Sequence, residues 1–384
     1  MSHHGSHHHH HHKRYFLAVD GFRLLASMNI VLFHLQGIGG LWDMREKPLW
    51  LFHILKGPAF HASVFFLLGG FIFTIKFAEK ATNFSTWEFL KKRFSELYPL
   101  HLGTTLTMAA LKIVYCLHHG GLDLPKLGAS VFMHLSLLWS LFPFGTYALN
   151  RPSWALSAFF LCYLLFGVVL RQVVRIKRKR FCVIFSLLCM MPILGWTLLY
   201  GALGMPADLY PFFHTFGLVR FFEFLIGMLL ARFFQLSSVS EKHTVREAVL
   251  NDLLIAAAGG LVIFSLWFRT ADNGFFTYFS YHVLMIPLYF IILYGLAVER
   301  GVISRLLSFS FVRKTGRSSF YPYLIHIPLI SVFTFILEHY FHYNTFLHHP
   351  VNIVVFMIVL YGGGYLYVNR IRKRKPSGPH PVKG

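Results

Sequence analysis

Apolar runs about 20 residues long recur along this chain, and they constrain its fold more than any other feature. A helix of that length crosses the ~30 Å hydrocarbon core of a bilayer. Composition agrees, because 55% of the residues are hydrophobic and only 13% are charged, whereas a soluble domain carries roughly 25% charged residues. No run shows the ten-residue alternation of a transmembrane β-strand. We therefore predict an all-α polytopic membrane protein, a bundle of about ten transmembrane helices.

The apolar runs and the segments between them predict the order of the elements. An SxxE pattern at Ser85–Glu88 predicts a helix N-terminus and an amphipathic helix that ends at Tyr98–Pro99. Residues 126–152 contain a short apolar stretch with turn residues after it, and we assign them to the outer face as an interfacial or re-entrant segment. The predicted spans are approximately 16–38, 52–77, 100–117, 153–170, 181–200, 210–233, 250–268, 277–298, 318–340 and 351–368.

Basic residues decide the orientation of these spans. The segment 171–180 carries six bases and no acids, and such loops lie on the cytoplasmic side of a membrane. It reaches that side only if residues 126–152 do not cross. The resulting topology places 27 of the 36 Lys and Arg residues at the cytoplasmic face and six at the outer face. We therefore predict cytoplasmic N- and C-termini, a single membrane domain at 13–370 and a basic cytoplasmic tail at 371–384.

Several functional classes are disfavoured by composition and spacing. The formal charge of +21 would indicate nucleic acid in a soluble protein, but here the bases orient helices, so we predict no nucleic-acid partner. The four cysteines form no CxxC pair, and the spacing of potential ligands predicts no metal site. Residues 1–12, MSHHGSHHHHHH, are either an expression tag, which we favour, or a native metal-binding tail.

Ionisable residues inside predicted spans are the first candidates for function, because each costs roughly 2.5–3.5 kcal/mol to insert. Arg23 and His34 are eleven residues apart, which places them on one helix face about 16 Å apart along the axis. Two interpretations stay open for this pair. Either it is part of a catalytic site, or Arg23 pairs with Asp20 and a neighbouring group satisfies His34.

Other polar groups within spans favour structural interpretations. Arg220 and Glu223 are three residues apart and therefore neighbours on one helix face, which predicts a structural ion pair. His326 is a lone intramembrane histidine, a residue often hydrogen-bonded in packing. The pair Gly69–Gly70 permits a close approach of helices.

Six segments are informative in their order along the chain: 19–23 with 31–34 (VDGFR and VLFH), 65–71 (FFLLGGF), 89–100, 150–157 (NRPSWALS), 220–227 (RFFEFLIG) and 316–326. Together they resemble the membrane-bound acyltransferase-3 family, and the resemblance covers about residues 16–368. Two positions depart from the family pattern: Gly69 stands where the family usually has Ser, and Phe159 where it usually has Glu. Either the role carried by that Glu is absent in this chain, or another group supplies it.

The resemblance implies an integral membrane O-acyltransferase, one that transfers groups other than aminoacyl groups. It implies a cytoplasmic acyl-CoA donor, most commonly acetyl-CoA, and a hydroxyl acceptor on an extracytoplasmic glycan or lipid-linked saccharide. The implied setting is the lipid bilayer of a bacterial inner membrane. The acceptor stays open among lipopolysaccharide O-antigen, capsule, peptidoglycan, other polysaccharides and small metabolites. The runner-up is a transporter or flippase without transferase activity, although we find no convincing internal repeat.

The resemblance also implies roles for individual residues. Arg23 would orient the donor, and His34 would act as general base on the acceptor hydroxyl, because imidazole titrates near neutral pH. The extended pantetheine arm of CoA is comparable in length to the ~16 Å between them. Further donor-side candidates are Lys91, Lys92 and Arg93. Candidates on the acceptor side are Arg151, Trp154, Ser157 and His326.

Overall fold

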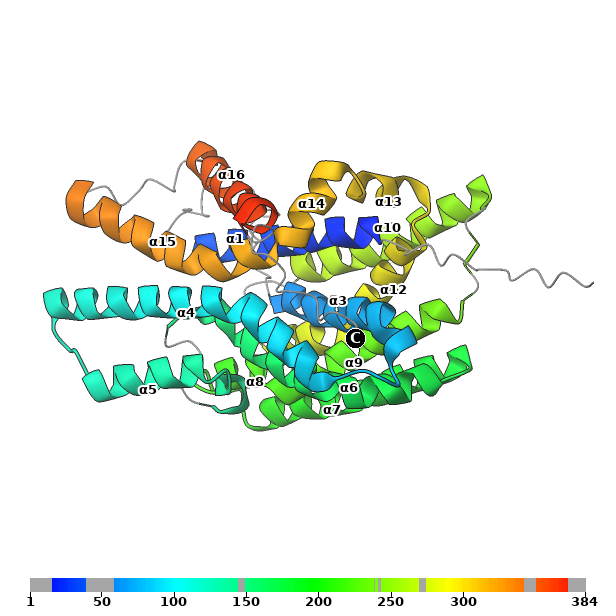
Figure 1. The fold of residues 1–384 in the computed structure, drawn as a ribbon, viewed down its shortest axis with the longest axis horizontal. Coiled ribbons are helices and arrows are strands. Elements are labelled where there is room, and N and C mark those ends of the chain that lie inside the picture. Colours follow the sequence, from blue (N-terminus) through cyan, green and yellow to red (C-terminus); the bar gives the residue numbers. More distant parts are fainter. Residues whose placement is uncertain are drawn as a thin grey trace, which may run out of the picture.

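The computed structural model describes residues 16–38, 59–143, 149–237, 239–240, 243–268, 274–341 and 350–371, and these contain helices and no strand. Figure 1 shows that most of the long helices run roughly along one direction, side by side. The chain begins with α1 (Leu17–Ile38) and continues with α3 (Ala59–Phe77). The predicted start of that second span, at residue 52, lies outside the described residues.

The remaining elements follow the predicted order of spans with a few shorter pieces between them. The long helices are α4 (Thr86–His119), α6 (Trp154–Arg175), α7 (Lys179–Ala202), α9 (Gly217–Gln235), α10 (Val245–Phe268), α12 (Met285–Val298), α15 (Phe320–Phe341) and α16 (Pro350–Leu366). The shorter helices are α5 (Leu124–Leu135), α8 (Tyr210–Thr215), α11 (Phe275–Phe279), α13 (Gly301–Leu307) and α14 (Ser310–Ser318). Single turns are η2 (Ala78–Lys80), η3 (Trp139–Leu141), η4 (Arg151–Ser153), and the π-helical η5 (Ser280–Leu284) and η7 (Tyr367–Ile371).

Among the described residues, nine helical segments are long and apolar enough to cross a membrane, so the chain is a multi-pass membrane protein. The predicted span that does not qualify contains α9, which is 19 residues long but carries Arg220, Glu223 and Arg232. These charges lower its hydropathy without removing it from the bundle, since α9 packs against α3, α6 and α7. A span that hydropathy alone would not select is therefore enclosed by neighbouring helices.

The helix at Thr86 continues further than predicted. The Ser85 hydroxyl accepts a hydrogen bond from the Glu88 amide at 3.3 Å, which confirms the predicted N-terminus. The predicted end at Tyr98–Pro99 is wrong, because α4 runs through Pro99 for 34 residues. Proline removes one backbone donor from a helix interior. Transmembrane helices tolerate this loss where neighbouring groups compensate for it.

The predicted span 210–233 is also corrected, since it consists of α8 and α9 separated at Phe216. The carbonyl of His214 accepts hydrogen bonds from the Arg220 side chain, from Nε at 3.0 Å and from Nη2. In a continuous helix that carbonyl would accept a hydrogen bond from the backbone amide of Leu218. The side chain of Arg220 therefore satisfies the carbonyl that the break would otherwise leave without a donor.

Residues 126–152 do not cross the bundle where they are described. Helix α5 has 12 residues, a length of about 18 Å, too short to span. Figure 1 shows it folding back beside the end of α4. His101 of α4 donates from Nε2 to the carbonyl of His134 at 2.9 Å, and burial lowers the pKa of His134 to about 4. This segment is thus held against α4, and its assignment to the outer face stays a prediction.

Close contact between α3 and α9 forms the centre of the bundle. A side chain at Gly70 would meet the carbonyl oxygen of Phe224, and one at Gly227 would meet that of Leu67. Two helices approach this closely only where small residues face the partner backbone. The close approach expected at Gly69–Gly70 is therefore confirmed, and it sets the separation of α3 and α9.

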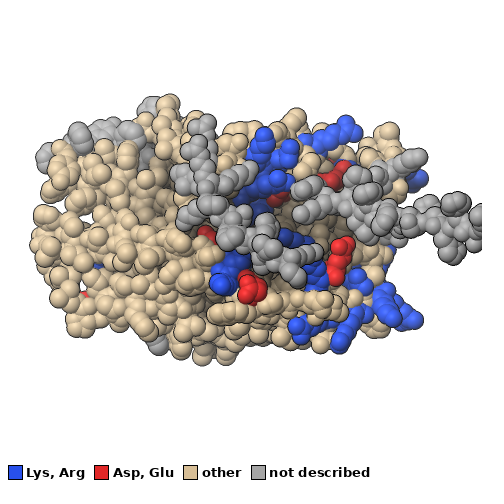
Figure 2. All heavy atoms as spheres, in the orientation of Figure 1, with Lys and Arg blue, Asp and Glu red and all other residues tan. Residues whose placement is uncertain are grey.

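The surface of the bundle separates apolar from basic regions. Helices α7, α10 and α16 expose large apolar side chains such as Leu187, Leu253 and Ile358, a surface suited to lipid and unfavourable in water. On the face drawn in Figure 2, Lys and Arg gather over one half of the molecule. The basic ends of α3, α6 and α9 lie in that half, as the charge pattern predicts.

Candidate functional site

An elongated cavity of about 320 Å³ opens between α1, α3, α4, α6 and α15. One stripe of α3 lines it, from Ala62 through Phe65, Gly69 and Phe73 to Lys76. These side chains recur at the spacing of one helix face. Fourteen residues of helix correspond to about 21 Å, so the cavity is long enough to hold an extended ligand.

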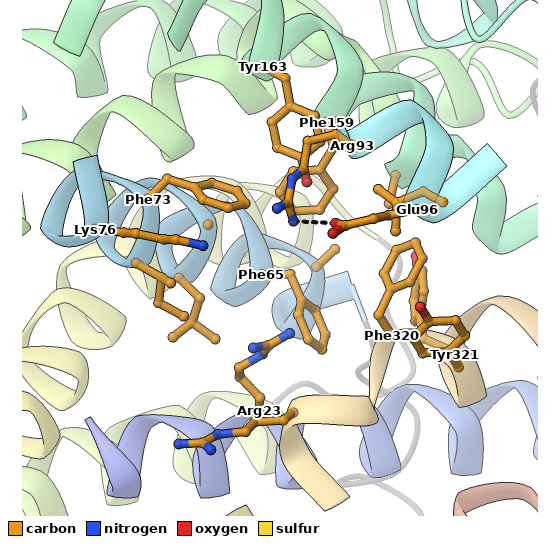
Figure 3. A pocket seen from close by; sticks show the side chains of 18 residues that line it. Arg23, Phe65, Phe73, Lys76, Arg93, Glu96, Phe159, Tyr163, Phe320 and Tyr321 are labelled. Carbon is orange, nitrogen blue, oxygen red and sulfur yellow. Dashed lines mark ion pairs between the residues drawn. The ribbon is translucent and has the colours of Figure 1, made fainter. Parts of the chain in front are cut away.

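Four bases, from α1, α3, α4 and the end of α14, gather at one end of this cavity. Arg23 lies 3.7 Å from Asp20, whose other oxygen accepts from Arg317 at 2.5 Å. In Figure 3, Lys76 and Arg93 reach into the cavity from α3 and α4. Arg93 pairs with Glu96 at 2.9 Å. Among the described residues, this end of the cavity combines four bases with the carboxylates of Asp20 and Glu96. The positive charge exceeds the negative charge in this group, so this end of the cavity favours anions.

Aromatic rings line the middle of the cavity, among them Phe159 and Tyr163 (Figure 3). The two departures from the family pattern meet there, because a Cβ on Gly69 would lie 3.0 Å from Cε1 of Phe159. The Phe159 ring stacks on Phe66 with centroids 4.4 Å apart. Where the family pattern would place Ser and Glu, this chain therefore has a glycine and a phenyl ring in contact.

His34 and His326 meet beyond the opposite end of the cavity. Nε2 of His326 lies 3.2 Å from Nδ1 of His34. Nδ1 of His34 is 3.0 Å from the carbonyl of Ile30, and Nδ1 of His326 is 2.6 Å from that of Tyr323. Carbonyl oxygens only accept, so both protons of the neutral rings lie on Nδ1. Nε2 of His34 is therefore unprotonated and has the lone pair that a general base requires.

The cavity and this histidine pair are close neighbours. Tyr323 lines the cavity, its ring lies 5.9 Å from that of Phe65, and it precedes His326 by one helical turn. Arg23 and His34, on the same helix, are separated by about 16 Å along the axis. The structure thus places Arg23 at the basic end of the cavity and His34 just past the other end. Both structural contacts considered from the sequence, Arg23 with Asp20 and His34 with a neighbour, are present as well.

A second buried polar group surrounds Arg220. Its Nη1 lies 2.6 Å from Oε1 of Glu223, which confirms the predicted ion pair. Ser63 donates to the same carboxylate oxygen at 2.9 Å. Nη2 of Arg220 lies 3.4 Å from Nδ1 of His282 and 3.5 Å from Nδ1 of His214. We refer to Ser63, His214, Arg220, Glu223 and His282 as the Arg220 cluster.

The sequence alone did not identify His214 and His282 as site residues. Each is a single histidine in an apolar run, and the two are 68 positions apart in the sequence. No sequence spacing relates either of them to the other candidate residues. The only local signal is irregular backbone, since His214 is the penultimate residue of α8 and His282 lies in the π-helical turn η5. Lys76 and Arg317 were missed for a similar reason, because nothing along the chain shows that they face Arg23.

The segment that begins α6 connects the two histidine groups. Asn150 donates to the carbonyl of Leu324 at 3.0 Å, and the Tyr323 hydroxyl donates to that of Pro152 at 3.0 Å. The Trp154 ring lies 5.4 Å from the Arg220 guanidinium and 5.4 Å from the His214 ring. Arg151 lies between Asn150 and Pro152, in the turn η4. Three of the four acceptor-side candidates, Arg151, Trp154 and His326, are therefore near His34 or the Arg220 cluster.

The remaining candidates lie elsewhere. Lys91 and Lys92 are exposed and do not line the cavity, whereas Arg93 does. Ser157 is buried, and its hydroxyl donates to the carbonyl of Leu137 at 2.6 Å and accepts from the amide of Ser140 at 3.2 Å. Ser157 thus holds the turns before α6 in place. Within the described part of the chain, no group of three or more His, Cys, Asp or Glu side chains is arranged to hold a metal ion.

Comparisons with known proteins agree on one family. A family model described as an acyltransferase domain, of the acyltransferase-3 type, matches residues 16–368. The acyltransferase MdmB of Streptomyces mycarofaciens is 29% identical over 257 residues. That alignment covers 64% of this chain and 63% of the relative, so the chain spans less than two thirds of the relative's length. No solved structure matches this chain.

Proposed function

Because the chain belongs to the acyltransferase-3 family, and is therefore a multi-pass membrane acyltransferase, we propose that it is an O-acetyltransferase. In this proposal an acetyl group passes from acetyl-CoA to a hydroxyl of an extracytoplasmic glycan or lipid-linked saccharide. The protein would lie in a bacterial inner membrane with its basic end, and both termini, at the cytoplasm.

The observation that carries the proposal is the cavity that runs from Arg23 to Tyr323, which lies one helical turn before His326 of the His34–His326 pair. Its cationic end suits the phosphates of a CoA donor, because guanidinium and ammonium groups bind phosphate by charge-assisted hydrogen bonds. Its aromatic middle suits an extended, weakly polar arm. Its length of about 21 Å would bring a thioester at the end of that arm close to Tyr323, one helical turn from His326.

The chemistry would then take place beside His34. Nε2 of His34 accepts the proton of the acceptor hydroxyl while that oxygen attacks the thioester carbonyl. The tetrahedral oxyanion collapses, the C–S bond breaks, and the imidazolium of His34 returns its proton to the departing thiolate. Atoms and charge balance without a metal or redox partner. His326, hydrogen-bonded at Nδ1 of His34, would hold the imidazole in its working orientation.

Purified protein in detergent provides the test. We expect it to bind radiolabelled acetyl-CoA and to hydrolyse it slowly, with His34→Ala abolishing hydrolysis and Arg23→Ala weakening binding. Envelope glycans from cells that express the parent protein should contain an acetyl ester, measured by mass spectrometry, that is missing with His34→Ala. Variants that insert normally and still transfer acetyl at the parent rate would refute the assigned roles. If the parent protein neither binds nor hydrolyses acetyl-CoA and transfers no acetyl group to candidate acceptors, a transporter is favoured instead.

A further inference from the structure

We infer that His214 is the hydrogen-bond donor to the oxyanion that forms during acyl transfer, and that Arg220 and His282 are positioning residues that hold its proton on Nε2. This inference rests on the proposed function, since it names the group that acts opposite His34. It assigns to the Arg220 cluster a role beyond the structural ion pair expected from its spacing.

The location of the protons follows from the partners. A guanidinium has only donors, so Nδ1 of both His214 and His282, which face Nη2 of Arg220, must accept. Nε2 of His282 lies 3.5 Å from Nδ1 of His214 and can serve as the second donor to it. The neutral His214 ring therefore has its proton on Nε2. This is the opposite arrangement to His34, whose proton lies on Nδ1.

Both histidines of the cluster are kept neutral by their surroundings. Arg220 and Glu223 are fully enclosed and neutralise one another. A protonated imidazole would add a second positive charge beside the buried guanidinium, and such a charge is repelled and poorly solvated. A neutral imidazole whose Nε2–H is fixed by a nearby cation can donate a hydrogen bond without losing its proton, as neutral histidine does in triosephosphate isomerase.

The donor and the base are brought together by the fold. His214 retains 7% exposure within the bundle, and its ring packs against Trp154. Trp154 directly follows the segment 150–153, which is hydrogen-bonded to α15 at Tyr323 and Leu324, beside His326. One unprotonated and one protonated ring nitrogen thus belong to the same buried region.

Irregular backbone at both histidines is an independent observation in favour of function. Helix geometry is interrupted next to His214 by the break at Phe216, and at His282 by the π-helical turn η5. Such turns inside helices occur frequently at functional sites. A pair needed only to neutralise charge, Arg220 with Glu223, would need neither interruption, because both residues lie within α9.

The step is balanced with His214 included. As the acceptor oxygen attacks, the carbonyl oxygen of the thioester gains negative charge and receives a hydrogen bond from Nε2–H of His214. When the C–S bond breaks, the carbonyl re-forms and the hydrogen bond weakens. His214 exchanges no proton at any point, and the proton transferred is the one that His34 takes from the hydroxyl. Preorganised donors of this kind contribute about 10²–10³-fold to kcat.

The experiment compares His214→Ala with His214→Gln in detergent-purified full-length protein, using acetyl-CoA hydrolysis as the probe because the same oxyanion forms there. We expect His214→Ala to lower kcat by about 10²–10³-fold with little change in KM. The Gln variant retains an N–H donor at the ε position, so we expect it to recover most of that loss. His118→Gln, at the exposed end of α4, is the matched control and should resemble the parent.

The pH profile distinguishes a donor from a base. The acidic limb of the kcat profile should have the same midpoint in His214→Gln as in the parent, because the proton of the nucleophile passes to His34 and not to His214. His34→Ala should show no hydrolysis at any pH. A loss below about tenfold in a well-folded His214→Ala, or an equal loss in the Ala and Gln variants, would overturn the inference. If the parent protein does not act on acetyl-CoA at all, the proposed function fails first and this inference with it.

Discussion

Two of the guanidinium–carboxylate pairs in this bundle, both with a spacing of three residues, differ in almost everything else. Arg23 lies 3.7 Å from Asp20, and the two side chains are 23% and 14% exposed. Arg220 lies 2.6 Å from Glu223, with exposures of 1% and 0%. Asp20 is shared with Arg317 at the basic end of the cavity, whereas Glu223 belongs to the enclosed centre.

The difference in exposure decides what each cation can do. A partly exposed pair is worth about 0–1 kcal/mol, so an incoming phosphate can replace Asp20 as the partner of Arg23 at little cost. An enclosed pair cannot exchange partners, because a charge left alone in the interior is strongly unfavourable. Identical spacing in the sequence therefore produces a binding group in one place and a positioning group in the other.

The largest expected effect is a difference in stability between variants of the two carboxylates. Glu223→Gln leaves the Arg220 charge buried without its partner, and we expect the free energy of unfolding to fall by about 3–5 kcal/mol. Asp20→Asn should change it by less than about 1 kcal/mol. Thermal midpoints of both variants in the same detergent provide the measurement. Equal losses would show that the two pairs are equivalent after all.

Arg23 and Arg220 should also differ in their effect on donor binding, and here the larger effect is expected at Arg23. We expect Arg23→Ala to raise KM for acetyl-CoA about 10–100-fold, the equivalent of the ~1.5–3 kcal/mol of a charged hydrogen bond. Its thermal midpoint should stay near that of the parent. Lys91→Ala, which removes an exposed base outside the cavity, serves as the control and should change KM by less than about twofold. A fall in kcat at constant KM would contradict a donor-binding role for Arg23.

Packing in the middle of the cavity provides a third comparison. Gly69→Ser places a Cβ 3.0 Å from the Phe159 ring and 3.2 Å from the Phe224 ring, and overpacking of this kind costs about 1–3 kcal/mol. The double variant with Phe159→Ala should be less destabilised than the sum of the two single variants, because the residues are in contact. Additive losses would indicate that the glycine and the phenyl ring are independent departures from the family pattern.

The smallest expected effect is that of salt. Raising ionic strength from 0.15 M to 1 M shortens the screening length from about 8 Å to 3 Å. We expect KM for acetyl-CoA to rise several-fold, since the cationic end of the cavity is accessible to ions. The contribution of the Arg220–Glu223 pair should not change, so the difference in midpoint between the parent and Glu223→Gln should be constant across this range. A salt-dependent difference would mean that ions reach the centre.

Much of the fold could be predicted because its dominant signals are local. Apolar runs locate the helices, and the Ser85 pattern correctly marks the start of α4. Two boundaries were wrong where a tertiary contact outweighed the local signal. Proline at position 99 did not end α4. The break between α8 and α9 is not visible in the hydropathy, and there the Arg220 side chain donates a hydrogen bond to the carbonyl of His214.

The residues of the candidate site also fall into two groups, those that a local pattern relates and those that only tertiary contacts bring together. Arg23 and His34 lie on one helix, so helical periodicity was sufficient to relate them. His326 could be named as a polar residue within a span, but its contact with His34 joins residues 292 positions apart. Lys91 and Lys92 were plausible from charge alone, and the structure directs them away from the cavity. No local pattern could separate them from Arg93.

By itself, the sequence determined that this is a helical membrane protein with one strongly basic side, because hydropathy and charge act through the solvent and need no partner. It also related the arginine and histidine of α1, since one helix fixes their separation. Only the tertiary structure decided which neighbours they meet. Whether an arginine with an acidic residue three positions away binds a ligand or holds a histidine depends on its exposure, and exposure is a property of the packed bundle.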